Sequence, residues 1–538
     1  MQRTNGGLSG DQCDVVIVGA GYAGLLMLCR ARGLGLNARV FERGDRVGGT
    51  WYWNRYPGAR CDTESLEYSY QFSDDLFQNW KWAERFATQP ELLEYAQHFA
   101  EHFNLLPHVK FNTSVNRASF DEASKRWSVK TDVGQEVSAK FLILATGCLS
   151  STNVPKIPGL SDFKGPLYHT GQWPAGRVPL AGKVVGIIGT GSSAVQVITT
   201  IAPVVKELSV FQRTANYVVP AHNGPIAREY EAQVLANHAE FRHNNATMIR
   251  AHGYLNRGRD VSALTVPRQE VEQDLERRWQ LGGLNFLDGY NDLLSDLEAN
   301  KIPAEFVHAK IRSIVKDQSV ADLLCPTHPI GCKRVSVGDG YYETYNRENV
   351  HLVDIRSTPI EKITADGPVV AGNTYGVDVL ICATGFDAMT GSILSMEIVG
   401  RNGLRLVDKW AAGPRNYLGL SVNGFPNLFT MTGPGSPSVL TNMHVSIEHH
   451  SDWITNCLAA MMAAQKTEIE ATESAEQNWV KRVDDIANGT FLPSCNSWYL
   501  GANIPGKPRM FMPYVGFPSY SQVCASVAKD GYVGFRLT

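Results

Sequence analysis

Two short glycine-rich loops are the parts of this sequence best suited to chemistry on a nucleotide. Each loop follows an apolar run and precedes an apolar stretch with helical spacing. Glycines in such a place permit a tight turn and let the backbone approach a pyrophosphate, while the N-terminus of the helix faces the negative charge. The residues at the three key positions are Gly19, Gly21 and Gly24 in the first loop and Gly189, Gly191 and Ala194 in the second. The pattern predicts two dinucleotide sites, and an ordinary glycine-rich turn is the alternative.

The residue that ends the next apolar run distinguishes the two loops. Glu42 lies 23 residues after Gly19, and Arg213 lies 24 residues after Gly189. A carboxylate at this place accepts hydrogen bonds from ribose hydroxyls, whereas a guanidinium binds the 2′-phosphate that distinguishes NADP from NAD. We therefore expect FAD at the first site and NADPH at the second, with the flavin reduced by the nicotinamide. A solvated surface position for Arg213 is the alternative.

Six short apolar runs are expected to form the strands that position these loops. They span residues 14–18, 38–41, 141–147, 183–188, 208–212 and 380–385. Such runs are typical of parallel strands that are buried on both faces. The order strand, loop, helix, strand occurs at both loops. It predicts an α/β fold with two Rossmann-like dinucleotide-binding domains, one for FAD and one for NADP, and with a helical insertion in the NADP domain.

The expected domains are interleaved along the chain. The FAD-binding domain takes residues 1–150 and 385–538, and the NADP-binding domain takes 151–220 and 331–384. Residues 221–330 contain charge-dense runs without a glycine-rich loop and are expected to form the helical insertion. The runs at 141–147 and 380–385 both end with Ala-Thr-Gly. Each is expected to return the chain to the neighbouring domain. Five prolines between positions 155 and 179 predict a connector without regular structure.

The composition is that of a large globular protein. With 538 residues, 43% hydrophobic and 19% charged, the chain is neither disordered nor a coiled coil and can form several domains. The 50 Lys and Arg nearly balance the 53 Asp and Glu, so no basic field is available for nucleic acid or an anionic membrane. A polar start and the lack of a long apolar run lead us to expect a cytoplasmic protein. Ten cysteines without a C-x-x-C pair predict reduced, mostly structural thiols and no metal site.

Two further motifs resemble those of a known family. Residues 163–174 match the F-x-G-x-x-x-H-x-x-x-W-P fingerprint through Phe163, Gly165, His169, Trp173 and Pro174. Residues 48–62 match the pattern G-G-x-W-x-x-x-x-Y-P-G-x-x-x-D, which ends at Asp62. On these motifs the chain resembles the type I Baeyer–Villiger monooxygenases over nearly its whole length. Its tail motifs at 433–438 and 497–506 are most similar to those of the phenylacetone and steroid monooxygenases.

The resemblance implies that NADPH reduces FAD, that O2 adds to the reduced ring, and that the resulting C4a-peroxyflavin attacks a ketone. The product would be an ester or a lactone, with sulfoxidation as a side activity. Aryl, cyclic and steroidal ketones remain open as substrates, and no obligate protein partner is expected. A flavin-containing N- or S-monooxygenase shares both loops but usually lacks the tryptophan-proline ending, and is the nearest alternative. A flavoprotein reductase and a nucleotide-binding redox sensor are less favoured.

The resemblance also implies the catalytic residues. Arg334 matches the family's arginine beside the flavin, where an always-charged guanidinium can stabilise the developing negative charge. Asp62 would hold Arg334 by a salt bridge, and Lys333 matches the lysine on the NADP phosphate. A structural pairing at a domain interface is the alternative for Arg334. His169 could act as a general base, but its place in the connector favours a hinge role between the domains, with Trp173 packed in the same motif.

Other positions fall where the family binds its cofactors and substrate. Those around FAD are Thr50, Trp51, Tyr52, Trp53, Tyr68, Val115 and Met443. Those around NADP are Arg60, Cys61, Ser192, Ser193, Gln196, Thr214 and Trp498. The ketone pocket would be shaped by Ser438, Val439, Leu440 and Met443. The segment 514–520 is one residue shorter than in the relatives and has a proline, so its conformation remains open, as does the oligomeric state.

Overall fold

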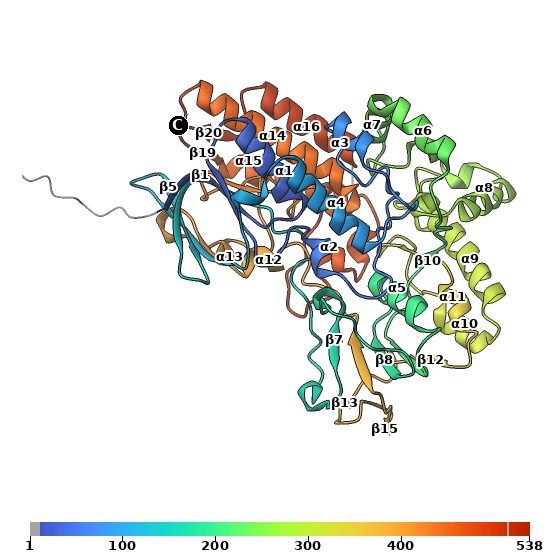
Figure 1. Ribbon diagram of the computed structural model, residues 1–538. Coiled ribbons are helices and arrows are strands. Elements are labelled where there is room, and N and C mark those ends of the chain that lie inside the picture. Colours follow the sequence, from blue (N-terminus) through green and yellow to red (C-terminus); the bar gives the residue numbers. More distant parts are fainter. Residues whose placement is uncertain (1–10, 514–515) are drawn as a thin grey trace, which may run out of the picture.

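The computed structural model describes residues 11–513 and 516–538 and builds them around two mainly parallel sheets (Figure 1). The larger sheet has eight strands in the order β17-β4-β5-β6-β1-β2-β3, with β18 beside β6. Its strands are β1 (Asp11–Val18), β2 (Ala38–Phe41), β3 (Val109–Lys110), β4 (Val115–Asp121), β5 (Arg126–Thr131), β6 (Glu136–Leu144), β17 (Glu397–Val399) and β18 (Leu428–Thr430). Val15, Val16 and Ile17 of β1 are fully buried, as expected for a strand covered on both faces.

The smaller sheet has five parallel strands in the order β12-β9-β8-β16-β7. These strands are β7 (Leu167–His169), β8 (Val184–Ile188), β9 (Glu207–Gln212), β12 (Val350–Asp354) and β16 (Val379–Cys382). The register pairs Ile188 with Phe211 on one side and with Cys382 on the other. The C-terminal ends of the three central strands therefore meet at one edge, where ligands bind in such sheets.

A glycine-rich loop and a helix follow the central strand of each sheet. The first loop leads from β1 into α1 (Tyr22–Gly33), and the second leads from β8 into α5 (Ser192–Ile201). The long helix α14 (Met443–Ala463) packs on α1. The two sheets bury separate apolar cores, since α1 and β1 belong to one cluster and α5 and β8 to another. The α/β fold with two Rossmann-like halves is confirmed.

Residues 221–330 are mainly helical, and their later helices flank the smaller sheet (Figure 1). Their α-helices are α6 (Arg228–Ala236), α7 (His238–Ala246), α8 (Arg268–Leu281), α9 (Leu297–Ile314) and α10 (Gln318–Leu324). Val271 and Leu275 of α8 and Ile311 of α9 share a buried cluster with the residues of β8. α8 and α9 are therefore joined to the smaller sheet by apolar packing, whereas Val234 of α6 and Phe241 of α7 belong to the core of the larger half.

The proline-rich connector contains more regular structure than the sequence predicts. Residues 167–169 form β7, an edge strand paired with β16, and two short 3-10 helices lie at Leu160–Asp162 and Thr170–Gln172. The expectation of an irregular connector was therefore wrong for the fingerprint. Pro166 directly precedes β7, and proline is tolerated at the start of an edge strand because an N–H there need not join the ladder.

The chain passes between the two sheets twice, and the two crossings lie side by side. Thr152 in the first crossing and Phe386 in the second form an antiparallel bridge. The N–H of Asn153 donates to the carbonyl of Gly385 at 2.9 Å, and the N–H of Asp387 donates to that of Ser151 at 2.8 Å. The connection between the halves is therefore a two-stranded ribbon.

The remaining elements complete both halves; the helix at 341–344 and the short strands within residues 362–370 share apolar clusters with the smaller sheet. They include α2 (Thr50–Trp53), α3 (Asp74–Asn79), α4 (Gln89–His102), β10 (Val218–Val219), β11 (Ser336–Val337), α11 (Tyr341–Thr344), β13 (Lys362–Ile363), β14 (Pro368–Val370), β15 (Asn373–Thr374), α12 (Gly391–Leu394), α13 (Leu406–Lys409), β19 (Ile469–Ala471), α15 (Glu473–Asn488), α16 (Phe517–Lys529) and β20 (Phe535–Leu537). Among the helices of the described residues, none is both long and apolar enough to span a bilayer.

The C-terminal segment that departs from the family lies partly outside the described residues. Tyr514 and Val515 are not among them. The rest of the segment begins α16, where the Phe517 N–H donates to the carbonyl of Ile249 at 2.8 Å. Pro518 falls in the first turn of this helix, where the missing N–H is not needed. The proline therefore begins the helix without breaking it.

One pair of cysteines contradicts the prediction of reduced thiols. Cys332 and Cys495 form a disulfide across 163 residues, with their Cα atoms 5.5 Å apart. The other eight cysteines, all among the described residues, are not disulfide-bonded. Sequence spacing could not reveal this pair, because the two residues approach each other only when the helical segment 221–330 docks on the C-terminal part of the chain.

Candidate active site

The first glycine-rich loop has the shape of a pyrophosphate cradle. A Cβ atom on Gly24 would collide with the carbonyl oxygen of Gly19, and one on Gly21 would lie 3.3 Å from the Cα of Gly49. Glycine at position 24 therefore lets α1 pack closely on the loop that follows β1, and glycine at position 21 lets the loop approach the Gly48-Gly49 turn. Gly21 is the N-cap of α1 and has no side chain to bond the first N–H groups, which leaves them for an anion. This half of the site fits the diphosphate of FAD.

Glu42 lies beside this loop, as its position predicts. Its carboxylate is buried and accepts hydrogen bonds from the N–H of Ala20 (2.7 Å) and of Gly44 (2.8 Å). Each carboxylate oxygen has a further lone pair, so Glu42 can also accept from a ribose hydroxyl. The acid holds the loop in place and faces the site from the end of β2.

The aromatic residues expected around FAD are only partly brought together. The indole N–H of Trp51 donates to the hydroxyl of Tyr68 at 3.2 Å, and the two rings are nearly perpendicular. Tyr52 and Trp53 are half-buried and pack on each other, with ring centroids 4.8 Å apart. Thr50, at the start of α2, is exposed, whereas Val115 lies in the core cluster of the larger sheet. The residues expected around FAD thus form two aromatic pairs, Trp51 with Tyr68 and Tyr52 with Trp53.

The second loop opens onto free space. Gly191 is the N-cap of α5, and a Cβ atom on it would meet nothing within 4 Å in the described part of the chain. The hydroxyl of Ser192, at the start of α5, contacts that of Ser336 at 3.0 Å, and Thr190 donates to the carbonyl of Thr214 at 2.8 Å. A helix N-terminus that faces open space at the end of a parallel strand suits a dinucleotide.

Two cations flank this loop. Burial lowers the pKa of Lys333, and the nearby positive charge of Arg213 lowers it further. The positive charges of Lys333 and Arg213 repel each other in the folded protein. An anion bound between them offsets this repulsion. Arg213 is exposed at the end of β9, so the pair can bind a phosphate. This arrangement fits the 2′-phosphate of NADP.

Gln196 of α5 joins the two halves of the site. Its side-chain N–H donates to the carbonyl of Arg60 at 3.1 Å, and its oxygen accepts from the hydroxyl of Tyr56 at 2.9 Å. The Arg60 guanidinium in turn pairs with Glu84 at 3.0 Å. The segment Arg60-Cys61-Asp62 therefore lies against the second loop, although it belongs to the first part of the chain. Tyr56 was missed in the sequence, where it appears only as a fixed position in the 48–62 pattern.

Arg334 and Asp62 form the central ion pair. The guanidinium Nε and one terminal nitrogen donate to the two carboxylate oxygens at 2.6 and 2.8 Å, and the other terminal nitrogen donates to the carbonyl of Val439 at 3.0 Å. Burial alone would raise the pKa of Asp62, but the charge and hydrogen bonds of Arg334 hold it below its usual value. Burial would lower the pKa of Arg334, and Asp62 more than offsets this effect. Both groups therefore remain charged around neutral pH, and a two-point bond fixes the guanidinium in one orientation.

An apolar cluster lies next to this ion pair. Val439, Met389, Tyr499, Met510 and Met512 are buried in it, with Leu440, Met443 and Trp498 packed at its edge. Ser438 is buried beside it and donates to the carbonyl of Thr432 at 2.7 Å. The structure thus brings together the four residues expected to shape the ketone pocket and the tryptophan expected on the cofactor-covering loop.

Tyr499 contacts Arg334, which the sequence did not predict. Burial raises the pKa of Tyr499, and the nearby charge of Arg334 opposes this effect. The signal was present in the sequence only as the neighbour of Trp498 in the motif 497–506. Tyr499 reaches Arg334 from a segment 165 positions further along the chain, so only the folded protein reveals the contact.

His169 lies where the two crossings meet. Its Nδ1 accepts from the N–H of Gly171 at 3.0 Å, so Nε2 carries the proton and faces the hydroxyl of Thr384 at 3.3 Å. That hydroxyl donates to the carbonyl of Asn153 at 2.6 Å. Burial lowers the pKa of His169, so the ring is neutral at neutral pH. Trp173 is buried and packs on Tyr168, with ring centroids 5.1 Å apart.

The rest of the fingerprint packs against the end of the smaller sheet. Phe163 is buried, and a Cβ atom on Gly165 would meet both the Phe163 ring and the carbonyl of Asp378, just before β16. The fixed side chains of the fingerprint therefore support β7 and the crossings.

Within residues 11–513 and 516–538, no group of three or more His, Cys, Asp or Glu side chains is placed to hold a metal ion.

Comparisons with known proteins agree with this geometry. A family model described as flavin-binding monooxygenase-like matches residues 12–225. A Baeyer-Villiger monooxygenase of Pseudooceanicola batsensis is 41% identical over 537 residues, which cover 99% of this chain and 97% of the relative. Cyclohexanone 1,2-monooxygenase of an Acinetobacter species is 39% identical over 529 residues, covering 97% and 96%. The solved structure of oxidized steroid monooxygenase bound to NADP has a TM-score of 0.93 and 47% identity, covering 98% of this chain and 99% of that one.

These findings confirm the resemblance found in the fingerprint and in the tail motifs. They also confirm FAD and NADP as the cofactors, and they set aside the flavin-containing N- or S-monooxygenases as the family. The chain belongs to the Baeyer–Villiger monooxygenases, which use NADPH, FAD and O2 to convert ketones to esters or lactones.

Proposed function

We propose that the substrates are bulky cyclic ketones, including steroidal ones, and that the products are lactones or esters. The observation that carries the proposal is the position of the Arg334–Asp62 pair against the apolar cluster of Val439, Met443 and Tyr499. A fixed cation beside an apolar surface suits a substrate with a single polar carbonyl. The names of the cyclohexanone and steroid monooxygenases that resemble this chain support the same class.

We propose these roles for the residues of the site. Bound FAD, once reduced by NADPH, supplies the oxygen-activating chemistry. Arg334 directs its remaining N–H groups at the negative charge that develops on the ketone oxygen, and Asp62 holds the guanidinium in position. The apolar side chains around Val439 exclude water from the reacting carbonyl. Arg213 and Lys333 bind the 2′-phosphate of NADPH, and the first turn of α5 binds its pyrophosphate.

The domain boundaries are part of the same proposal. We assign residues 1–150 and 385–538 to the FAD-binding domain, 151–220 and 331–384 to the NADP-binding domain, and 221–330 to an insertion in the latter. The separate cores of the two sheets and the paired crossings support this division. The cytoplasmic location expected from the sequence stays a prediction, which fractionation of the source cells would test.

The function is tested with the FAD-loaded enzyme, NADPH, 18O2 and a panel of linear, aryl, cyclic and steroidal ketones. We expect cyclic and steroidal ketones to give lactones or esters that carry one 18O atom, as measured by mass spectrometry. Preferred oxidation of short linear ketones would contradict the substrate class. If no ketone gives a product and NADPH is consumed only to form hydrogen peroxide, the ketone assignment itself fails.

His169→Gln is expected to lower kcat about tenfold and to leave the shape of the pH profile unchanged. The neutral ring bonds the Thr384 hydroxyl, which in turn bonds the carbonyl of Asn153; we expect this link to act on domain movement, and such steps often limit turnover. The measurement is kcat against pH for the wild type and the variant. Thr384→Val removes the same contact from the other crossing and should reproduce the effect. If an inflection between about pH 6 and 7 is present in the wild type and lost in His169→Gln, the residue is a general base instead.

A further inference from the structure

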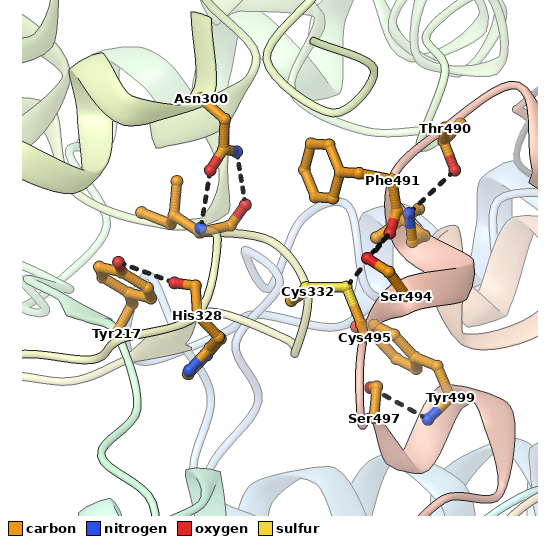
Figure 2. The surroundings of a disulfide bond; sticks show 12 residues. Tyr217, Asn300, His328, Cys332, Thr490, Phe491, Ser494, Cys495, Ser497 and Tyr499 are labelled. Atoms are coloured by element: carbon orange, nitrogen blue, oxygen red, sulfur yellow. Dashed lines mark hydrogen bonds between the residues drawn. A yellow bond between two sulfur atoms is a disulfide. The ribbon is translucent and has the colours of Figure 1, made fainter. Parts of the chain in front are cut away.

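The Cys332–Cys495 disulfide lies between two segments that supply residues to the active site (Figure 2). Cys332 directly precedes Lys333 and Arg334, and Cys495 stands shortly before Trp498 and Tyr499. The two cysteines are buried, at 3% and 6% exposure, in a small cluster with Phe491 and Leu492. The bond therefore ties the segment that carries the catalytic cation to the segment that carries the aromatic cover.

The short chain between Cys495 and Tyr499 is well ordered. The hydroxyl of Ser497 accepts from the N–H of Tyr499 at 3.2 Å and begins the 3-10 helix Trp498–Leu500. On its other side Tyr499 contacts the Arg334 guanidinium. Cys332, Arg334, Tyr499 and Cys495 thus complete a ring, closed by the disulfide on one side and by a polar contact on the other. If the disulfide is reduced, only the polar contact of Tyr499 with Arg334 holds the two segments together at this place.

The far end of the same segment is attached to the second crossing. The side chain of Asn503 donates to the carbonyl of Phe386 at 2.7 Å, and the Lys507 ammonium donates to the carbonyl of Ala388 at 2.7 Å and pairs with Asp387. The segment from 495 to 507 therefore spans from the Arg334 segment to the ribbon between the halves. The disulfide is its covalent anchor at the active-site end.

We propose that Cys332 and Cys495 form a reversible thiol–disulfide site that sets how tightly NADP(H) is held. In the disulfide form, the segment that carries Trp498 and Tyr499 is tied to the segment that carries Lys333 and Arg334. In the dithiol form, no covalent bond holds the start of the segment 495–507, so this part can move away from the Arg334 segment. Tyr499 is then a positioning residue for Arg334 that acts only while the segment is docked.

The chemistry balances with an ordinary dithiol as reductant. Two thiol groups of the reductant give up two electrons and two protons, the S–S bond of Cys332–Cys495 breaks, and two S–H groups form while the reductant becomes a disulfide. Glutathione disulfide reverses the step. Disulfides that occur in the cytosol are usually transient and catalytic or redox-sensing, which suits a reversible role in the compartment expected from the sequence.

The surroundings can accommodate both forms. The carbonyl oxygen of Phe491 lies 3.7 Å from the sulfur of Cys495 (Figure 2), where it can accept a hydrogen bond from a thiol but not from a disulfide. Phe491 also lines a surface cavity of about 440 Å³ between residues 295–298 and 488–491. Phe491 therefore belongs both to the lining of the cavity and to the apolar cluster around the disulfide.

The first measurement establishes the bond in the FAD-loaded enzyme. The protein is alkylated without reduction and digested, and the peptides are identified by mass spectrometry. We expect one linked pair that contains Cys332 and Cys495, which disappears after incubation with dithiothreitol and returns with glutathione disulfide. Complete alkylation of both cysteines before reduction, even after incubation with glutathione disulfide, would overturn the proposal.

The second measurement is the Kd for NADP+. It needs no ketone, so its outcome does not depend on whether the proposed reaction is correct. Reduction should raise the Kd about fivefold or more, the lower range of coupling between linked sites, and should speed proteolysis within residues 489–512. Reoxidation should restore both values. An unchanged Kd and an unchanged cleavage rate after complete reduction would refute the proposal.

Matched variants separate the bond from its surroundings. The Cys332→Ser/Cys495→Ser double variant should bind NADP+ like the reduced wild type and should not respond to the dithiol. Cys29→Ser alters a half-buried free cysteine and should respond like the wild type. In Tyr499→Phe the Kd should be raised already, and reduction should change it less than in the wild type. If reduction weakens binding equally in Tyr499→Phe, the positioning role of Tyr499 is wrong.

Discussion

Arg334→Ala is expected to reduce ester and lactone formation by about 100- to 1000-fold, while FAD remains bound. The reason is that removal of one fixed donor to a developing negative charge costs about this factor in other enzymes. The variant loses the donors that Asp62 and the carbonyl of Val439 hold in place. Product formation is quantified by mass spectrometry beside NADPH consumption and hydrogen peroxide release. Peroxide should become the main fate of the oxygen.

Three controls separate catalysis from stability in this experiment. Arg334→Ala leaves the Asp62 carboxylate unpaired in a largely buried place, which can itself cost about 3–5 kcal/mol. The Asp62→Asn/Arg334→Ala double variant removes that charge and should melt at a higher temperature than Arg334→Ala while remaining inactive. Arg334→Lys keeps the charge but loses the two-point bond and should recover only a minor part of the activity. Arg117→Ala breaks an exposed pair with Glu397 and should have full activity. Near-normal ester yield in Arg334→Ala would remove Arg334 from its proposed role.

Arg213→Ala is expected to raise the KM for NADPH about 10- to 100-fold and to leave the KM for NADH nearly unchanged. One charge-assisted hydrogen bond to a phosphate contributes about 1.5–3 kcal/mol, and only NADPH has that phosphate. The measurement is the steady-state rate of cofactor oxidation with each nucleotide, so NADH is the internal control. Lys333→Ala should change the preference in the same direction, because Lys333 lies close enough to Arg213 for the charge of Arg213 to lower its pKa. Equal changes for both nucleotides would show that Arg213 contacts another part of the cofactor.

The sequence predicts the parts of this site that depend on local pattern. The loops after β1 and β8 could be found because glycines between an apolar strand and a helix have few other uses. Glu42 and Arg213 could be placed because the helix and strand that follow each loop have nearly constant length. The ion pair of Arg334 and Asp62 was expected only through the family resemblance, because residues 272 positions apart leave no pattern that joins them.

Other features could not be predicted because they form only when distant segments dock. β7 becomes a strand because β16 offers it a free edge, which outweighs the propensity of a proline-rich stretch for irregular structure. Tyr499 reaches Arg334, and Cys332 reaches Cys495, only after the C-terminal segment folds over the site. The shared Ala-Thr-Gly endings at 145–147 and 383–385 predict the two crossings, but nothing in the sequence predicts that Asn153 pairs with Gly385.

The paired crossings have a consequence for recombination. All of the chain between Thr152 and Phe386 leaves and rejoins the rest of the protein at two adjacent backbone positions. A chimaera that exchanges this stretch with that of a relative would therefore have its two junctions side by side, in one short ribbon. Exchange at this point would keep most of each apolar core from a single parent, apart from contacts such as those of Val234 and Phe241 in the core of the larger half and of Phe86 in that of the smaller half. It offers a way to combine the nucleotide preference of one enzyme with the substrate pocket of another.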